Sequence, residues 1–321
     1  MEVFILTLNQ MAMMFLLILA GAFLRKKKIV PENTGTTLAK LETYIFCPAL
    51  NLYNMITRCT AKTFAENSSL IFAGLAVILA AVLLAYPLSR LFVRKVDTEE
   101  KLYQRNIYKY AMAFGNYGFM GNFIILGIWG FDVYFKYSLF CFFVTLFCTV
   151  WGLFILIPKD KAGSVWANLK KGLLTPPTIS LVIGMILGLS GISQYVPDFA
   201  VRALESASYC QGPVAMLLAG VIIGGYNFRE LISKKKVYLA SLMRLIVIPA
   251  VFLIVLKAIG VEEEILIFTL VVLATPLGLN TIVYPAAYGG DTKTGASMAT
   301  ISNTFAIATL PLMYLLFIEL L

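Results

Sequence analysis

Two short stretches of the sequence place asparagine, glycine and proline inside apolar runs. Residues 114–122 read FGNYGFMGN, and residues 274–290 read ATPLGLNTIVYPAAYGG. In a helix interior, glycine costs about 1 kcal/mol and proline about 3 kcal/mol relative to alanine. At membrane depth, the freed backbone groups of such a stretch are tolerated only where they are buried in protein or border a water-filled cavity.

The two stretches predict a pair of interrupted helices that share one binding site. Where a helix restarts after a break, its free N–H groups form a positive dipole end equivalent to roughly +0.5 charge. Two such ends facing a common point favour an anion. Asparagine amides can donate to that anion or can cap the freed backbone. We predict that the substrate is bound by Asn116, Tyr117, Gly118, Gly121, Asn122, Pro276, Gly278 and Asn280.

A simpler interpretation is that the glycines only allow neighbouring helices to approach closely, as small residues do in membranes. Glycine alone would serve that purpose, whereas both stretches also contain asparagine and the second contains proline. We therefore favour a binding site.

Three further polar residues lie within apolar runs. Asn51 and Asn54, three positions apart, share one face of the helix that follows Pro48. Both belong to the predicted substrate-binding set, although a hydrogen bond between helices fits them equally. Arg244 lies in the run YLASLMRLIVIPAVF, where it would pair with an acid, attract an anion or snorkel towards the cytoplasm.

Ion coupling has its own candidates. Glu42 and Glu205 would carry a proton or help to bind a cation if they are buried, whereas snorkelling to the headgroups or a local ion pair is the alternative. Ser302, Asn303 and Thr304 either line the ion or substrate path or bond neighbouring helices.

The composition is that of an integral membrane protein. Of the 321 residues, 60% are hydrophobic and 13% are charged, and the mean hydropathy is +0.85. Soluble domains have roughly 25% charged residues. Apolar runs of about 20 residues match the thickness of the hydrocarbon core as helices. We expect ten spans, at about residues 3–24, 36–57, 69–93, 107–129, 136–158, 176–196, 203–225, 237–259, 265–288 and 296–319.

Histidine is absent from the sequence. This excludes histidine metal sites, Ser-His-Asp triads and histidine proton relays. The intramembrane sequence also has no paired aspartates. We therefore expect neither an enzyme nor a bound metal or cofactor, with a sodium ion left open.

Lysine and arginine indicate the orientation in the cell membrane. If the N-terminus lies outside, 21 of the 26 lysine and arginine residues fall on inner loops or inner span ends. The positive-inside rule then places both termini outside the cytoplasm. The same distribution accounts for the formal net charge of +9 without a nucleic-acid partner.

Five predicted spans lie on each side of a short, basic cytoplasmic connection at residues 159–175. The second five would start from the opposite membrane face, so residues 1–158 and 176–321 are expected to form an inverted repeat, which is typical of transporters. A break in the fourth span should then recur in the ninth. Asn116 and Asn280 are indeed separated by about half the chain.

Four segments together resemble the auxin efflux carrier family, which includes plant auxin exporters and many bacterial carriers. They are CPALNLY, GNYGFMGN, TPLGLNTIVYPAAYGGD and SNTFAIATLPL. The resemblance implies crossed, broken fourth and ninth helices, as in bile-acid symporters and sodium/proton antiporters. It also implies a scaffold domain of spans 1, 2, 6 and 7 that forms a homodimer, a transport domain of spans 3–5 and 8–10, and small organic anions as substrates. Family members often have proline where this chain has Asn122, so its first crossover is more polar.

We therefore predict a secondary transporter that moves a small organic anion, such as malate, malonate or an aromatic acid, by an elevator-like motion. Its expected partners are this anion and membrane lipid. Coupling to sodium, coupling to a proton through Glu42 or Glu205, and uniport all remain open. The alternative is a membrane sensor or structural protein that keeps a carrier fold without transport.

Overall fold

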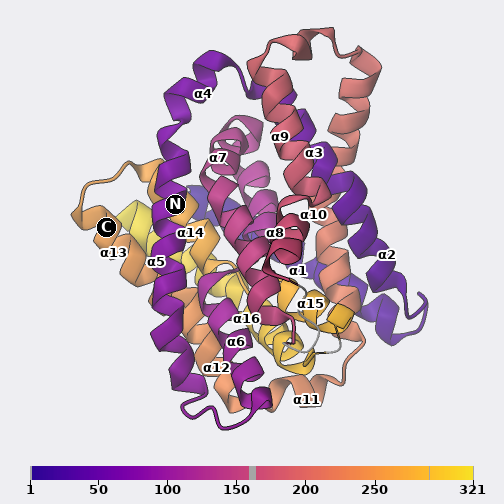
Figure 1. Ribbon diagram of the computed structural model, residues 1–321, viewed down its shortest axis with the longest axis vertical. Helices are drawn as coiled ribbons and strands as arrows, with labels where there is room; N and C mark the ends of the chain where they lie inside the picture. Colours follow the sequence, from indigo (N-terminus) through magenta and orange to yellow (C-terminus); the bar gives the residue numbers. More distant parts are fainter. Residues whose placement is uncertain (1, 159–163, 289, 321) are drawn as a thin grey trace.

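Apolar segments form helices because a backbone inside lipid must satisfy its polar groups within its own segment. The computed structural model describes residues 2–158, 164–288 and 290–320, and the regular elements in these ranges are all helical (Figure 1). They are α1 (Glu2–Lys26), α2 (Thr34–Leu41), η1 (Glu42–Phe46), α3 (Cys47–Arg58), α4 (Ala61–Asn67), α5 (Ser69–Phe92), α6 (Glu99–Ala113), η2 (Tyr117–Gly121), α7 (Asn122–Leu156), α8 (Val165–Leu173), α9 (Pro176–Leu189), η4 (Ile192–Tyr195), α10 (Asp198–Gly224), α11 (Phe228–Ile232), α12 (Lys235–Leu242), η5 (Met243–Val247), α13 (Ile248–Ala258), α14 (Glu263–Ala274), α15 (Asn280–Tyr288), α16 (Lys293–Tyr314) and η6 (Leu315–Leu320).

Several of these helices are long and apolar enough to cross a membrane. Within the described residues, six pass this criterion: Val3–Lys26, Ser69–Phe92, Tyr117–Leu156, Asp198–Gly224, Lys235–Ala258 and Lys293–Leu320. The pair α8 and α9, bent by 56°, adds a seventh if it counts as one span. The chain is therefore a multi-pass helical membrane protein, although fewer than ten spans are continuous helices.

The difference from the ten predicted spans has local causes. The expected second span is divided among α2, η1 and α3, and the expected ninth between α14 and α15. The expected break between the fourth and fifth spans is present as a kink at Gly130 (φ 75°), where two helical segments of α7 meet, whereas residues 131–135, expected as a loop, are helical. Glycine adopts that conformation without a Cβ clash. The expected connection at 159–175 contains α8, and residues 159–163 lie outside the described residues.

Two wide π-helical turns each precede a proline and place a charged residue inside the bundle. Pro48 and Pro249 have no N–H, and their rings crowd the carbonyl four residues earlier. The turns η1 and η5 relieve this crowding, and the Cys47 N–H bonds back to the Glu42 carbonyl. Glu42 lies in η1 and Arg244 in η5, and both side chains are buried.

The helices pack in two groups. In the first, α1 lies along α10, and α3 lies along α9 and α10. In the second, α5 packs on α6 and α7, α12 on α16, and α13 on α14. Helices α3, α9 and α10 are on the right of Figure 1, and α5, α12 and α13 are on the left. Small residues bring α9 close to α3, since a Cβ added to Gly184 would lie 2.7 Å from the Cβ of Met55.

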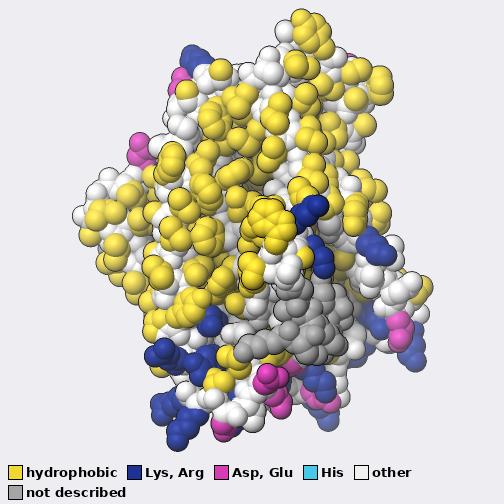
Figure 2. Space-filling model, in the orientation of Figure 1, with side chains coloured by type: hydrophobic (Ala, Val, Ile, Leu, Met, Phe, Trp, Pro, Cys, Tyr) yellow, Lys and Arg dark blue, Asp and Glu magenta, His cyan; other side chains and the backbone are white. Residues whose placement is uncertain are grey.

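The surface agrees with a membrane-embedded bundle. Apolar side chains cover most of the visible face in Figure 2, and most of the visible lysine and arginine side chains gather in its lower part. Basic residues at one end of a bundle are typical of the cytoplasmic side.

Candidate functional site

The two breaks predicted from the sequence lie against each other. Short extended segments separate α6 from η2 and α14 from α15. These segments run antiparallel, with an isolated bridge between Gly115 and Leu277. The Asn116 N–H donates to the Pro276 carbonyl at 2.7 Å. The two interrupted helices therefore cross at their breaks.

Glycine at the crossing makes room for close neighbours. A Cβ on Gly115 would lie 2.6 Å from the Thr275 carbonyl oxygen and would clash with Nη2 of Arg244. A Cβ on Gly278 would lie 3.1 Å from the Gly115 carbonyl oxygen. Gly118 differs, because a Cβ there would enter open space. Gly115 and Gly278 thus allow the crossing, whereas Gly118 borders a cavity.

Arg244 joins the two half-helices that end at the crossing. Its Nη2 donates to the Val272 carbonyl at 2.8 Å, and its Nη1 donates to the Met112 carbonyl at 3.3 Å. These carbonyls belong to the last turns of α14 and α6, which are negative dipole ends. The side chain is 2% exposed, so the snorkelling interpretation is wrong. Its partners are carbonyl groups rather than the acid considered from the sequence.

The half-helix η2 restarts after the first break without a side-chain cap. Asn116 is the N-cap residue of η2, yet its side chain makes no capping hydrogen bond. The first N–H groups of a helix have no intrahelical acceptor. Of the two roles considered for Asn116, capping is therefore not the one observed. Across the crossing, Ser302 of α16 accepts from the Leu277 N–H at 3.0 Å, which satisfies one backbone group of the second break.

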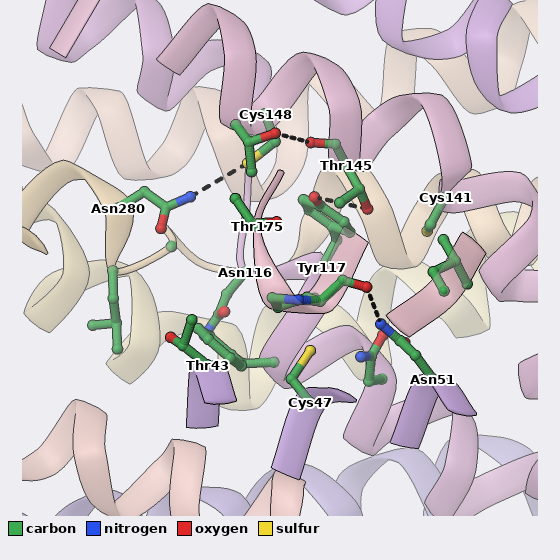
Figure 3. Close-up of a pocket in the computed structure, with 18 of the residues that line it drawn as sticks. Thr43, Cys47, Asn51, Asn116, Tyr117, Cys141, Thr145, Cys148, Thr175 and Asn280 are labelled. Atoms are coloured by element: carbon green, nitrogen blue, oxygen red, sulfur yellow. Dashed lines mark hydrogen bonds between the residues drawn. The ribbon is translucent and has the colours of Figure 1, made fainter. Parts of the chain in front are cut away.

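A cavity of about 230 Å³ adjoins the crossing (Figure 3). Its walls come from both breaks and from η1, α3, α7 and α9. Seven predicted substrate-binding residues line it: Asn51, Asn116, Tyr117, Gly118, Asn122, Gly278 and Asn280. Sequence segments far apart in the chain thus contribute to one cavity.

Three other predicted substrate-binding residues do not line this cavity. Asn54 donates to the Ser138 hydroxyl at 3.1 Å, which is a hydrogen bond between α3 and α7. Gly121 packs against the hydroxyl of Tyr137. Pro276 contributes its carbonyl to the bridge between the breaks. These residues have packing or hydrogen-bonding roles: Pro276 at the crossing itself, and Asn54 and Gly121 in contacts with α7.

Asn280 connects the second break to helices of the first half of the chain. Its Nδ2 donates to the Tyr110 hydroxyl at 2.9 Å and to the Cys148 sulfur at 3.4 Å. Asn51 combines both roles considered for it, because it lines the cavity and its Nδ2 also donates to the Pro177 carbonyl at 2.9 Å. The amide nitrogens of both residues are thus already hydrogen-bonded.

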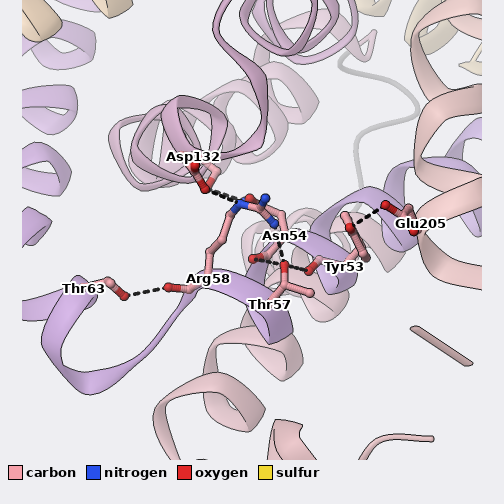
Figure 4. A network of polar contacts seen from close by, with 8 residues as sticks. Tyr53, Asn54, Thr57, Arg58, Thr63, Asp132 and Glu205 are labelled. Carbon is pink, nitrogen blue, oxygen red and sulfur yellow. Dashed lines mark hydrogen bonds and ion pairs between the residues drawn. The ribbon is translucent and has the colours of Figure 1, made fainter. Parts of the chain in front are cut away.

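The residues considered for ion coupling lie in different surroundings. Glu42 is fully buried, and its carboxylate oxygens have no hydrogen-bond partner among the described residues. Glu205 is half-buried and accepts from the Tyr53 hydroxyl at 2.8 Å (Figure 4). Asn303 donates to a carbonyl of its own helix at 2.6 Å, and Thr304 is exposed. Ser302 alone of the three C-terminal residues contacts the crossing, as described above.

Polar contacts also connect α1 and α3 with α7. Arg58 Nε lies 2.8 Å from a carboxylate oxygen of Asp132 (Figure 4). The Gln10 amide donates to the Phe123 carbonyl at 2.8 Å. Together with the hydrogen bond of Asn54, these contacts cross between the two groups of helices.

Some lining residues were not anticipated from the sequence. They include Thr43, Cys47, Cys141, Thr145, Cys148 and Thr175 (Figure 3). Single threonine and cysteine residues in apolar runs have no distinguishing pattern, since both also serve as packing residues. Tyr110 was likewise missed, because its contact with Asn280 depends on packing between distant segments.

Comparison with known proteins places the chain among transporters. The sequence model of a family described as membrane transport protein matches residues 6–168 and 162–314. These matches include both breaks. A search of curated proteins found no match.

Proposed function

The chain belongs to the membrane transport protein family, which includes the auxin efflux carriers, and we propose that it is a secondary transporter of small organic anions. The observation that carries this proposal is the cavity at the crossing, where the restarting ends of both interrupted helices meet Asn116 and Asn280. Carboxylates and aromatic acids are the proposed substrate class.

The charge around the cavity supports an anion. The N-terminal ends of η2 and α15 contribute partial positive charge. Arg244 offsets the opposite, negative ends of α6 and α14. Neither aspartate nor glutamate is among the described residues that line the cavity. A volume of about 230 Å³ is below the roughly 300–1,000 Å³ of pockets for drug-sized ligands, which favours a small substrate.

The packing of the helices supports the proposed ten-span inverted repeat. In that repeat, span 1 corresponds to span 6, and each following span corresponds to the one five later. Helices α1 and α9 belong to spans 1 and 6, and α3 and α10 belong to spans 2 and 7. The contact of α1 with α10 therefore corresponds to the contact of α9 with α3. Span 3 (α5) contacts span 4 (α6), as span 8 (α13) contacts span 9 (α14). Span 3 also contacts span 5 (in α7), as span 8 (α12) contacts span 10 (α16). Inverted repeats with discontinuous helices are typical of secondary transporters.

We propose an elevator-like mechanism for this arrangement. The group containing α1, α3, α9 and α10 would be a scaffold, and the group containing the crossing would move against it. Homodimer formation through the scaffold, location in the cell membrane and external termini are proposed from the family resemblance and the charge distribution.

Thermal stabilisation tests the proposed substrate class. The purified protein would be melted with a panel of mono- and dicarboxylates and aromatic acids, each with and without sodium. A ligand at 100 times its Kd adds about 2.7 kcal/mol, so at least one organic anion should raise the melting temperature. Folded protein that responds to none of these anions would contradict the proposal and favour a different substrate or a non-transporting protein.

A further inference from the structure

Glu42 is a buried acid whose oxygens have no partner. It begins the wide turn η1, its side chain is fully buried, and neither carboxylate oxygen has a hydrogen-bond partner in the described part of the chain. It faces the amide of Gln211 on α10, which is also fully buried. Both polar atoms of the Gln211 amide likewise have no partner within that part. The Gln211 amide is therefore the polar group within reach of the Glu42 carboxyl group, and no further hydrogen-bond partner serves either side chain among the described residues.

The surroundings of Glu42 do not provide a cation to balance its charge. The turn η1 packs against α2, α3, α9 and α10. Among the described residues of these helices, the ionisable group that faces Glu42 is the thiol of Cys47, which cannot supply positive charge. Helix α9 has no ionisable side chain. The remaining ionisable residues of η1 and these helices are exposed or contact another partner: Lys40, Tyr44, Tyr53, Arg58, Asp198, Arg202, Glu205, Tyr209 and Cys210.

An unpaired carboxylate is not stable at such a position. Burying an isolated charge is so costly that the group takes up a proton instead. The protonated acid can then donate one hydrogen bond to the Gln211 amide oxygen. A metal cation fits less well, because hard cations take about six or more oxygen ligands. Among the described residues of η1 and the helices packed against it, the buried side-chain oxygens without a partner are the two of Glu42 and one each of Asn54 and Gln211, which are fewer than six.

The acid lies next to the substrate cavity. Thr43 follows Glu42 directly, Cys47 follows the same wide turn, and both line the cavity. Wide turns of this kind occur often at functional sites. Water or substrate in the cavity is thus separated from the Glu42 carboxyl group by residues that adjoin Glu42 in the chain. A movement of the helices that widens the cavity would hydrate the carboxyl group, which would then release its proton.

We propose that Glu42 and Gln211 form a proton-binding site and that this proton is the coupling ion for the anion in the adjacent cavity. The inference rests on the proposed transport function. Since Glu42 lies in the proposed scaffold, the proton crosses only when the carboxyl group takes it up from one side of the membrane and releases it to the other as the transport domain moves past, and one such proton for each monovalent anion makes the net transported charge zero. An inside-negative potential, worth about 2.3 kcal/mol per charge per 100 mV, then no longer opposes uptake of the anion.

Carbodiimide labelling tests the proton site without a substrate. Dicyclohexylcarbodiimide reacts with protonated carboxyl groups in apolar surroundings. Mass spectrometry of the labelled, folded protein should find the adduct at Glu42 and show less of it as the pH rises. The proposal would be overturned by folded protein that gives no adduct at Glu42, or by labelling that sodium suppresses at constant pH, since sodium would then occupy the site.

Anion binding at several pH values tests the coupling. For one proton per anion, the apparent Kd of a stabilising carboxylate should rise about tenfold per pH unit above the pKa of the coupling group. The variant Glu42→Gln should bind with little pH dependence, whereas Glu205→Gln, which alters a half-buried acid, should behave like the wild type. Unchanged pH dependence in Glu42→Gln would overturn the proposal. If no carboxylate binds the wild type, the proposed substrate class fails, and the labelling result still decides the proton site.

Discussion

At the residue scale, the two asparagines of the breaks have different tasks. Asn116 lines the cavity at the start of η2, and its side chain makes no capping bond. Asn280 also lines the cavity, but its amide nitrogen is already bonded to Tyr110 and Cys148. Asn116 is therefore the amide that is better placed to donate to a bound anion, while Asn280 also fixes the position of its own half-helix.

Replacement of Asn116 by alanine should weaken anion binding without unfolding the protein. A hydrogen bond to a charged group contributes roughly 1.5–3 kcal/mol, so the affinity should fall about 10- to 150-fold, while the melting temperature without ligand changes little. Asn280→Ala should lower both the anion affinity and the melting temperature without ligand, because the Tyr110 hydroxyl would lose its hydrogen-bond donor. The measurement is thermal melting with and without the stabilising carboxylate. Wild-type affinity in Asn116→Ala would rule out a direct contact.

Replacement of Arg244 by alanine should destabilise the crossing. Two carbonyl groups, at Val272 and Met112, would lose their donor, at about 1–3 kcal/mol for each buried unsatisfied group. Methylguanidinium should enter the vacated space and raise the melting temperature of Arg244→Ala but not that of the wild type. The control is Arg202→Ala, since the Arg202 side chain is 77% exposed and its ion pair contributes little. Equal stability of Arg244→Ala and the wild type would contradict the bridging role.

At the element scale, the crossing of two interrupted helices depends on how closely their extended segments approach. The segments are joined by the bridge at Gly115 and Leu277, and the guanidinium of Arg244 packs against the same glycine. Only a residue without a side chain fits between them. The local geometry thus determines where the half-helix ends lie and which of them face the cavity.

A pair of glycine substitutions separates packing from cavity lining. Gly115→Ala should destabilise the fold by about 1–3 kcal/mol, because the new methyl group would overlap Thr275 and Arg244. Gly118→Ala should fold normally, since its methyl group enters open space, and should weaken binding of the larger anions of the panel by reducing the cavity. Melting temperature without and with each anion distinguishes the two effects. A stable Gly115→Ala variant would contradict the close crossing.

The positions of both breaks could be predicted from the sequence, because glycine, asparagine and proline in an apolar run are a strong local signal. The burial of Arg244 could not be predicted from the sequence, because this residue lies in a wide turn before Pro249 that periodicity does not reveal. The predicted end of the fourth span at residue 129 agrees with the kink at Gly130, whereas the helical course of residues 131–135 was missed because a loop was expected there. Contacts such as that of Asn280 with Cys148 depend on tertiary packing, which periodicity does not describe.

At the scale of the whole molecule, transport requires the two helix groups to move relative to each other. Polar contacts hold them together in this state, including those of Gln10 with Phe123, Asn54 with Ser138 and Arg58 with Asp132. An exposed ion pair contributes at most about 1 kcal/mol. Such contacts can therefore break and re-form during a transport cycle, whereas a covalent bond at the same place cannot.

A disulfide between the two groups should stop transport. Asn54 Nδ2 and Ser138 Oγ lie 3.1 Å apart, so Asn54→Cys with Ser138→Cys should form a cross-link in a protein whose native cysteines are replaced. The matched control is Gly35→Cys with Val221→Cys. Both residues belong to the proposed scaffold, and a Cβ on Gly35 would lie 3.7 Å from a methyl carbon of Val221. Only the first cross-link joins parts that are proposed to move.

The most direct test is uptake of the stabilising carboxylate into proteoliposomes by these two cross-linked variants, before and after reduction. The account predicts that the cross-link between residues 54 and 138 blocks uptake, that a reductant restores it, and that the cross-link between residues 35 and 221 leaves uptake unchanged. Full uptake with the first cross-link formed would contradict the proposed relative motion. A folded, uncross-linked protein that binds the anion but does not transport it would contradict the transport function.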